Sequence, residues 1–234
     1  MPHQTSVPVV LMRHAQSVSN QEQRFTGWDD PPLTKQGLIE ARQAGECLRE
    51  RGLEFDLAYS SRLQRAVHTL DIVLQNLGQV SLRRQQDWQL NERHFGVVQG
   101  MAKARVLADY GEQRVSQWRR EADAKPPALL RSDAAHPANN PLYADVEAQQ
   151  LPATESLIDT RRRISGYWHE QLVPVIQQGR RVLICSHANT LRALLMSLRE
   201  DCQQDMQQLE MPGAKPMVLW LDADARMLDW EFVC

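Results

Sequence analysis

The sequence predicts a three-layer α/β fold in which a mainly parallel sheet is flanked by helices on both faces. Two continuous apolar runs, VPVVLM (7–12) and RVLICS (181–186), are typical of buried strands. Strand-like runs alternate with longer amphipathic stretches, and this alternation favours parallel strands joined by helices. With 234 residues, of which 42% are hydrophobic, the chain is long enough to form a single α/β domain over residues 1–234.

The first elements have clear boundaries. Segment 25–33 contains Gly, Asp and Pro residues and is predicted to be a loop. Thr34 is of a residue type that caps helices, and the helix after it has apolar residues on one face and a stop at Gly52. A short strand is expected over 55–61.

A second helix follows that strand directly. Ser61 and Gln64 have the spacing of a capping box, and apolar residues then recur at helical intervals until Gly78. A weaker strand is expected near 80–88.

The middle of the chain changes in composition. Short helices expected at 102–109 and 112–121 precede a stretch over 123–145 that is rich in Pro, Ala, Asp and Asn. This composition predicts an irregular insertion. We expect residues 100–154 to form a lid or insertion over the site, although an insertion without a functional role fits the composition of 123–145 equally well.

The last third returns to alternating helices and strands. A long helix is expected from Thr154 to about Gln178, with Gly179 as its stop. The strong strand at 181–186 comes next. One more helix and two late strands, which could lie at the sheet edge, are expected over 189–199, 216–222 and 227–233.

Composition argues against several classes of partner. The 27 Lys and Arg residues and 29 Asp and Glu residues give a formal charge of −2, so no overall basic field attracts nucleic acid or an anionic membrane. The four cysteines are far apart and form no C-x-x-C pair, which argues against a zinc site or a disulfide framework and favours a reducing compartment. No run reaches the length of a membrane span, and the start of the chain lacks signal-peptide features. We therefore expect a cytoplasmic protein.

Cationic and imidazole side chains follow three of the predicted parallel strands. His14 comes after the first, Arg62 and Arg65 come after the second, and His187 comes after the strand at 181–186. Because ligands of such folds bind outside the carboxyl ends of the strands, we expect these side chains to converge on one site.

The residue types at this edge suit phosphoryl transfer. A neutral imidazole can attack phosphorus without a metal when cations surround it, and the planar fork of arginine matches phosphate oxygens. We therefore interpret His14 as the nucleophile, with Arg13, Arg65 and a protonated His187 as the groups that stabilise the phosphoryl oxygens. For the dipeptide Arg13-His14 alone, a surface arginine beside a structural histidine is the simpler interpretation.

A metal site is the weaker alternative. The histidines at 14, 68, 94 and 187 lack the spacing of metal ligands, and the neighbouring arginines would repel a cation. No metal is predicted.

Further charged residues have two interpretations each. Glu92 is the best candidate for a general acid or base, but it could instead be a solvated carboxylate paired with Arg93. Arg119 and Arg120 end a predicted helix, where they are either solvated or clamp a substrate carboxylate, and Lys103 is ambiguous in the same way.

Taken in order, the motifs resemble the cofactor-dependent phosphoglycerate mutases of the histidine phosphatase superfamily. RHAQSVSN (13–20) is similar to the family signature around the phosphorylated histidine, and FTGWDD (25–30), LNERHFG (90–96) and LPATESL (151–157) are more specific to the mutases. The resemblance runs from Leu11 to about Asp229.

The resemblance implies a role for each matching position. His14 corresponds to the phosphohistidine, Arg13 and Arg65 to ligands of the phosphoryl group, His187 to a stabiliser of that group and Glu92 to the acid or base. Substrate-binding positions also include Ser17, Asn20, Thr26, Gly27, Phe95, Lys103, Arg119, Arg120, Ala188 and Asn189.

The activity implied by the resemblance is the interconversion of 2-phosphoglycerate and 3-phosphoglycerate, primed by 2,3-bisphosphoglycerate, without a metal and in a dimer or tetramer. One alternative is a histidine phosphatase or a bisphosphoglycerate synthase/phosphatase that acts on small phosphorylated metabolites with water as an acceptor. Another is a non-catalytic paralogue that binds phosphorylated ligands or a protein partner.

Several positions depart from the family pattern. Ala15 and Ala188 stand where Gly is usual, Ser19 replaces Trp, Phe95 replaces Tyr and Ala102 replaces Asn. Alanine at a position of positive φ would cost about 1 kcal/mol, so we expect neither alanine to need that conformation. The chain also ends near the point where many members continue into a C-terminal tail, and we expect this to favour hydrolysis of the phosphoenzyme.

Overall fold

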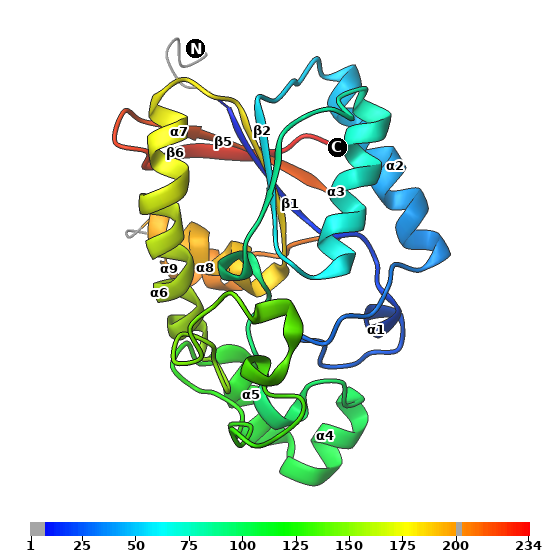
Figure 1. The fold of residues 1–234 in the computed structure, drawn as a ribbon, viewed down its shortest axis with the longest axis vertical. Helices are drawn as coiled ribbons and strands as arrows, with labels where there is room; N and C mark the ends of the chain where they lie inside the picture. The colour runs from blue at the N-terminus through cyan, green and yellow to red at the C-terminus, as the bar shows by residue number, and fades with distance from the viewer. Residues whose placement is uncertain (1–7, 200–202) are drawn as a thin grey trace.

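Six strands form one sheet in the order β3-β2-β4-β1-β5-β6 (Figure 1). The computed structural model describes residues 8–199 and 203–234. The first four strands are parallel, whereas β5 is antiparallel to β1 and β6 is antiparallel to β5. The strands are β1 (Val9–Arg13), β2 (Leu57–Ser60), β3 (Arg84–Gln86), β4 (Val182–Ser186), β5 (Pro216–Leu221) and β6 (Met227–Phe232). The predicted mainly parallel α/β fold is confirmed.

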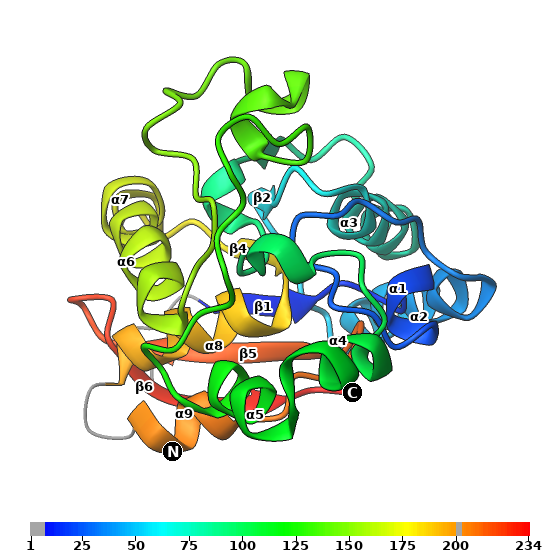
Figure 2. The ribbon, with the colours of Figure 1, turned by 90° about the horizontal axis from the view of Figure 1, so that it is seen from below.

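Helices cover both faces of this sheet. In Figure 2, α2 and α3 lie on one side of it and α6 and α8 on the other. The helices are α1 (Val18–Gln21), α2 (Lys35–Glu50), α3 (Gln64–Leu77), α4 (Lys103–Tyr110), α5 (Glu112–Arg120), α6 (Leu157–Tyr167), α7 (Val173–Gln177), α8 (Ala188–Leu198) and α9 (Gln203–Gln208). The sequence analysis did not anticipate the short helices α1 and α9. Residues 1–7, which include the first residue of the strand predicted at 7–12, lie outside the described residues.

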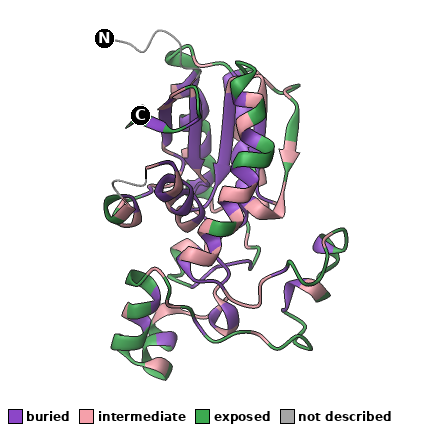
Figure 3. Cartoon of the chain, turned by 90° about the vertical axis from the view of Figure 1, so that its left-hand side faces the viewer, coloured by how far each residue is buried: buried purple, intermediate pink, exposed green. Residues whose placement is uncertain are grey.

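Alternation along β1 divides the apolar core into two clusters. Val9 and Leu11 pack in the cluster formed with α6 and α8, and Val10 and Met12 pack in the cluster formed with α2 and α3. Both faces of the strand are therefore covered, which explains why its sequence is continuously apolar. Figure 3 shows the central strands as buried, whereas the helices around them have exposed outer faces.

The start of α2 was predicted correctly. This end of the helix lies close to the loop that follows β1. The side chain of Thr34 accepts a hydrogen bond from the backbone nitrogen of Gly37, as expected for an N-cap. A Cβ at Gly37 would lie 2.1 Å from the carbonyl oxygen of Gln16, so only glycine allows this approach. The helix therefore packs directly on the segment that follows His14.

The capping box predicted at Ser61 is wrong. Helix α3 begins after Leu63, which has no side-chain capping bond. The Ser61 hydroxyl instead lies 2.8 Å from Nε2 of His187 and accepts a hydrogen bond from the backbone nitrogen of Leu63. A serine at a strand end is equally able to bond a helix or a neighbouring side chain, and here the imidazole is its partner.

The long helix predicted from Thr154 starts later and is interrupted. Ser156 and Asp159 form the capping box of α6, whereas the Thr154 hydroxyl donates to the carbonyl of Pro126. A π-helical turn, Trp168–Leu172, separates α6 from α7. Pro174 has no backbone N–H to continue an α-helical ladder, which accounts for a break at this point.

Residues 123–145 form the irregular segment that their composition predicts. Two short 3₁₀ turns, Pro137–Asn139 and Pro141–Tyr143, interrupt an otherwise irregular path. The buried ring of Tyr143 anchors the segment, because its hydroxyl accepts a hydrogen bond from the side chain of Asn91 at 2.8 Å. Helices α4 and α5 precede it and lie below the carboxyl end of β1 (Figure 1).

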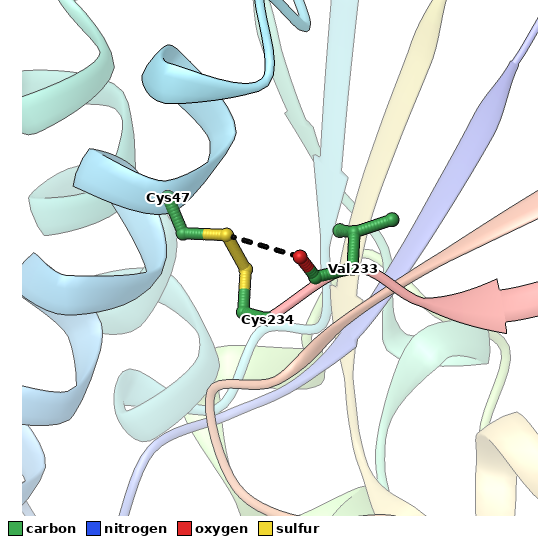
Figure 4. The surroundings of a disulfide bond; sticks show 3 residues. All are labelled: Cys47, Val233 and Cys234. Carbon is green, nitrogen blue, oxygen red and sulfur yellow. Dashed lines mark hydrogen bonds between the residues drawn. A yellow bond between two sulfur atoms is a disulfide. The ribbon is translucent and has the colours of Figure 1, made fainter.

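A disulfide joins Cys47 of α2 to Cys234, which follows β6 (Figure 4). The prediction that the cysteines form no disulfide is therefore wrong for this pair. The two residues are 187 positions apart, so no local spacing could reveal the bond; the sheet brings them together. Cys185 is a free, buried cysteine in β4.

Within residues 8–199 and 203–234, every helix is too short or too polar to cross a lipid bilayer.

Candidate active site

His14 follows β1 directly, and two hydrogen bonds fix its tautomer. Its Nδ1 lies 2.7 Å from the carbonyl oxygen of Ala15 and must donate the hydrogen of that bond. Its Nε2 accepts a hydrogen bond from Nε of Arg65 at 3.2 Å. Nδ1 therefore carries the proton, and the lone pair of Nε2 is the nucleophilic one.

His14 is also held in its neutral form. Its side chain is buried, and burial, followed by the positive charges of Arg65 and Arg13, holds its pKa well below the usual value of 6.5. A neutral imidazole has the lone pair that attack on phosphorus needs. The cations that add to the effect of burial on this pKa are the ones that would stabilise phosphoryl oxygens.

The guanidinium of Arg65 is fixed by the loop that was predicted over 25–33. Its Nη1 and Nη2 donate to the carbonyls of Asp29 and Gly27 at 2.7 and 2.8 Å. Gly27 has a φ of +54°, and a Cβ there would overlap the side chain of Gln99. Burial lowers the pKa of Arg65 to about 10, so the group remains a cation at neutral pH.

His187 follows β4 and lies beside His14, with ring centroids 5.0 Å apart. Its Nε2 bonds the Ser61 hydroxyl, and its Nδ1 is buried without a hydrogen-bond partner among the described residues. Burial, and then the charges of Arg65, His14 and Arg13, hold its pKa well below 6.5. The lowered pKa favours a neutral ring, in which only one of the two nitrogens carries a hydrogen, whereas the sequence predicts a protonated His187.

Arg13 has a similar unused donor. Its Nη1 donates to the carbonyl of Met211 at 2.8 Å, whereas its buried Nε has no partner in the described part of the chain. Buried polar groups are nearly always hydrogen-bonded, so the unpaired Nε donor of Arg13 and the unpaired ring nitrogen of His187 fit a site that binds a polar ligand.

Glu92 is the acidic residue that reaches this cavity. It is only 8% exposed, and its Oε1 accepts a hydrogen bond from the backbone nitrogen of Arg93 at 2.8 Å. The alternative of a solvated ion pair with Arg93 is wrong, because that guanidinium donates to the carbonyls of Glu155, Trp118 and Ala124. A buried carboxyl that lines the same cavity as a nucleophile is suited to proton transfer.

A cavity of about 620 Å³ joins these groups to the predicted substrate positions. Of the residues named from the sequence, it is lined by Arg13, His14, Asn20, Thr26, Gly27, Arg65, Glu92, Phe95, Lys103, Arg119, Arg120, Ala188 and Asn189. His187 is not among the lining residues, although its ring lies beside that of His14, and Ser17 is not among them either. Ser17 is buried and caps α1, where it forms a capping box with Asn20, so its predicted place in the cavity wall is wrong.

The outer part of the cavity is also cationic. Arg119 and Arg120 are exposed, and Lys103 is half-buried with its Nζ 3.1 Å from the side-chain oxygen of Gln23. Burial, followed by the charges of Arg119 and Arg13, lowers the pKa of Lys103. Cations that destabilise one another in this way are stabilised together by an anionic ligand.

Several further residues line the cavity but were not predicted from the sequence: Arg24, Phe25, Arg93, Trp118, Arg192, Gln207 and Gln208. Arg192 lies one helical turn after Ala188 on α8, so helical spacing could have found it. The remaining residues have no pattern in the sequence that separates them from ordinary loop and helix residues.

The two alanines that replace glycines fit without strain. Neither Ala15 nor Ala188 has positive φ, as expected. Ala15 is fully buried, and its nitrogen donates to the Thr69 hydroxyl at 3.0 Å. The backbone of the loop after His14 therefore tolerates a side chain at this position.

The described residues hold no group of three or more His, Cys, Asp or Glu side chains arranged to bind a metal ion. Among the other histidines, His94 is buried and accepts a hydrogen bond at Nδ1 from the backbone nitrogen of Gly96.

The sheet and its paired histidines define an α/β enzyme with a histidine-centred anion site. A sequence profile of the histidine phosphatase superfamily (branch 1) matches residues 9–139, and the chain belongs to this superfamily. The phosphatases and mutases that share this fold differ in what accepts the phosphoryl group, so membership alone does not name the reaction.

Solved structures agree on the fold. Mycobacterial glucosyl-3-phosphoglycerate phosphatase in complex with VO3 is 22% identical, with 97% of each chain covered and a TM-score of 0.72. A putative alpha-ribazole-5'-P phosphatase from Escherichia coli is 20% identical over 97% of this chain and 96% of that chain, with a TM-score of 0.73. Bacillus stearothermophilus YhfR is 21% identical over 94% and 93% of the two chains, with a TM-score of 0.72. At these identities the likeness concerns the fold.

Proposed function

We propose that this protein is a 2,3-bisphosphoglycerate-dependent phosphoglycerate mutase that interconverts 2-phosphoglycerate and 3-phosphoglycerate in glycolysis and gluconeogenesis. The observation that carries the proposal is the presence of two groups of cations in one cavity. Arg13 and Arg65 lie beside His14, whereas Arg119 and Arg120 are exposed further out. A substrate with a phosphate and a separate carboxylate uses both groups, whereas a simple phosphate monoester uses only the first.

The chemistry begins with attack of Nε2 of His14 on phosphorus. The Nε hydrogen of Arg65, which Nε2 accepts in the resting site, then lies beside the incoming phosphoryl oxygens. The unpaired Nε of Arg13 supplies a further hydrogen bond to those oxygens, and Nδ1 of His187 supplies another in the tautomer that carries the hydrogen on that nitrogen.

Glu92 gives or takes the proton that each phosphoryl transfer requires. As the ester P–O bond breaks, Glu92 gives a proton to the leaving oxygen of the glycerate. The mutase cycle itself starts from phospho-His14: the carboxylate first takes a proton from the phosphoglycerate hydroxyl as that oxygen attacks phosphorus, and the resulting bisphosphate returns a phosphoryl group to His14 in the second transfer. The intermediate has two phosphates, and its reorientation before the second transfer converts one isomer into the other.

The residues present fit 2,3-bisphosphoglycerate as the priming donor. The molecule has three anionic groups, and the cavity offers Arg13, Arg65, Lys103, Arg119 and Arg120, with the Nε donor of Arg13 buried and unpaired. When bound, it supplies the phosphoryl group that converts His14 to the active phosphohistidine.

A phosphatase, or a bisphosphoglycerate synthase/phosphatase, is the second candidate. The titles of similar solved structures name phosphatases, and the exposure of Arg119 and Arg120 gives water access to the outer cavity. Phe95 lines the cavity without the hydroxyl of the usual tyrosine, which removes a substrate contact worth about 1.5–3 kcal/mol if the partner is charged.

The deciding experiment measures isomerisation and phosphate release in parallel, with and without added 2,3-bisphosphoglycerate, over a panel of small phosphate esters. A mutase isomerises phosphoglycerate faster than it releases phosphate, and only after priming. Faster phosphate release on every substrate would assign the protein as a phosphatase.

A separate experiment tests the nucleophile. Radiolabelled bisphosphoglycerate should give an acid-labile, base-stable phosphoenzyme that is absent from His14→Ala. Label that persists in the variant would place the nucleophile elsewhere, and absence of label in the natural protein would support the non-catalytic paralogue. The expected oligomer and cytoplasmic location stay predictions.

A further inference from the structure

A buried ion pair lies behind the loop that carries Glu92. Glu155 precedes the cap of α6, and Arg163 lies within that helix. Nε and Nη2 of Arg163 lie 2.8 and 2.9 Å from the two carboxylate oxygens, and the two side chains are 6% and 4% exposed. Two charges removed from water are unfavourable unless further hydrogen bonds compensate them, so the remaining partners of this pair are informative.

The remaining donors of Arg163 go to one short stretch of backbone. Nη1 donates to the carbonyls of Gln89 at 2.6 Å and Asn91 at 3.1 Å. Nη2 donates to the carbonyl of Glu92 itself at 3.3 Å. The guanidinium therefore fixes the backbone just before Glu92 and at Glu92 itself.

Glu155 holds the other side of the same loop. Its Oε2 accepts from the backbone nitrogen of His94 at 2.9 Å, and its own nitrogen donates to the His94 carbonyl at 2.8 Å. Its carbonyl accepts from Nε of Arg93 at 2.8 Å. Together, Glu155 and Arg163 hold the chain both before and after Glu92.

We propose that Glu155 and Arg163 are positioning residues that set where the Glu92 carboxyl lies relative to His14. The inference rests on the proposed function, in which Glu92 protonates the leaving oxygen. Neither Glu155 nor Arg163 lines the cavity of His14, so both act through Glu92.

The proton step provides a selective readout. Phosphorylation of His14 forms the N–P bond and breaks the ester P–O bond, whose electron pair goes to the leaving oxygen. An alkoxide from 2,3-bisphosphoglycerate needs the proton of Glu92, whereas 4-nitrophenolate leaves without one. Misplacement of the Glu92 carboxyl therefore slows phosphoryl transfer from 2,3-bisphosphoglycerate to His14. It leaves transfer from 4-nitrophenyl phosphate nearly unchanged.

The experiment measures the rate of phosphoenzyme formation by rapid quench with both donors. Arg163→Lys keeps the charge but replaces the planar fork by one nitrogen, and Glu155→Gln keeps the size of the side chain. Each variant should lose about 100-fold with 2,3-bisphosphoglycerate, the effect of a small misplacement, and less than about tenfold with 4-nitrophenyl phosphate. Arg161→Lys is the matched control, because Arg161 lies on the same helix but bonds Ser197 and Gln203.

Equal losses with both donors would overturn the inference, because a merely structural role affects both reactions. Glu92→Gln distinguishes a failure of the proposed role of Glu92 from a failure of the positioning inference. If Glu92→Gln shows no preference between donors, the proposed role of Glu92 fails. If Glu92→Gln is selective and both positioning variants react like the natural protein, the positioning inference alone fails. If Arg163→Lys does not fold, the rates of phosphoenzyme formation with the two donors in Glu155→Gln test the inference.

Discussion

Nε of Arg65 donates a hydrogen bond to Nε2 of His14 over 3.2 Å, so the cation occupies the direction from which phosphorus must arrive. The bond must be exchanged for one to a phosphoryl oxygen as the reaction proceeds. Because Asp29 and Gly27 hold the other two guanidinium nitrogens, this exchange needs only a small movement. Arg65 thereby keeps the nucleophile neutral before the reaction and stabilises its charge afterwards.

Arg65→Lys should slow phosphoenzyme formation about 100- to 1,000-fold, the typical loss for one preorganised donor to a developing anion. Lysine keeps a positive charge but cannot bond His14 and both carbonyls at once. Rapid-quench labelling measures the rate. The matched control is Arg62→Lys, whose side chain forms a surface ion pair with Asp145. Equal rates in the two variants would contradict this role of Arg65.

The free energy of unfolding should fall as the pH decreases below about 6.5. Burial, followed by the charges of His136 and Arg163, lowers the pKa of His94 to about 3, whereas the unfolded chain titrates near 6.5. Between these values the unfolded state binds one more proton, so stability declines on acidification by up to about 1.4 kcal/mol per pH unit for this group. Denaturant melts from pH 7 to 5 measure the slope.

His94→Asn should reduce that slope, because asparagine keeps an acceptor for Gly96 but does not titrate. His169→Asn, on the exposed surface, is the matched control and should keep the slope of the natural protein. An unchanged slope in His94→Asn would show that His94 does not cause the acid sensitivity.

Arg119→Ala should raise KM for phosphoglycerate about tenfold with a smaller effect on kcat, because an exposed cation that holds a carboxylate contributes to binding in ground and transition states alike. Steady-state isomerisation assays measure both constants. Arg114→Ala changes an arginine of the same helix that does not line the cavity of His14, and should leave KM unchanged. If both variants behave alike, Arg119 has no specific contact with substrate.

Cys47→Ser should lower the free energy of unfolding by about 2–4 kcal/mol, because the bond to Cys234 restricts the unfolded chain over a long loop. Melts with and without a reducing agent check the cause. The natural protein should lose stability on reduction, and the variant should not respond. A natural protein whose stability is the same under both conditions would show that the bond does not form in solution.

Much of the fold could be predicted from periodicity because both faces of the central strands are covered. The apolar run in β1 and the helical spacing of α3 identified their elements, and the rule that ligands bind at the carboxyl edge brought His14, Arg65 and His187 together. Arg62, which was expected to converge with them, pairs with Asp145 and does not line the cavity. These inferences depend on local pattern and simple topology, which a single sequence contains.

The errors arise where a residue has two equally good local partners. Ser61 has the spacing of a helix cap but bonds His187, and Ser17 caps α1 and does not line the cavity. Arg163 lies in a run of three arginines, a pattern typical of a solvated helix face, although its own side chain is buried. Only tertiary structure decides between such alternatives.

The pairing of β1, β2 and β4 has a consequence for how activity returns during refolding. Met12 and Ser60 are both aligned with Cys185, and His14, Ser61 and His187 follow within two residues of that row. The row joins segments from the beginning, the first third and the last quarter of the chain, and contacts of such long sequence separation are slow to form. Competence for phosphoryl transfer should therefore appear as a late kinetic event, coincident with closure of the central sheet, and a time course of labelling would report when that closure is complete.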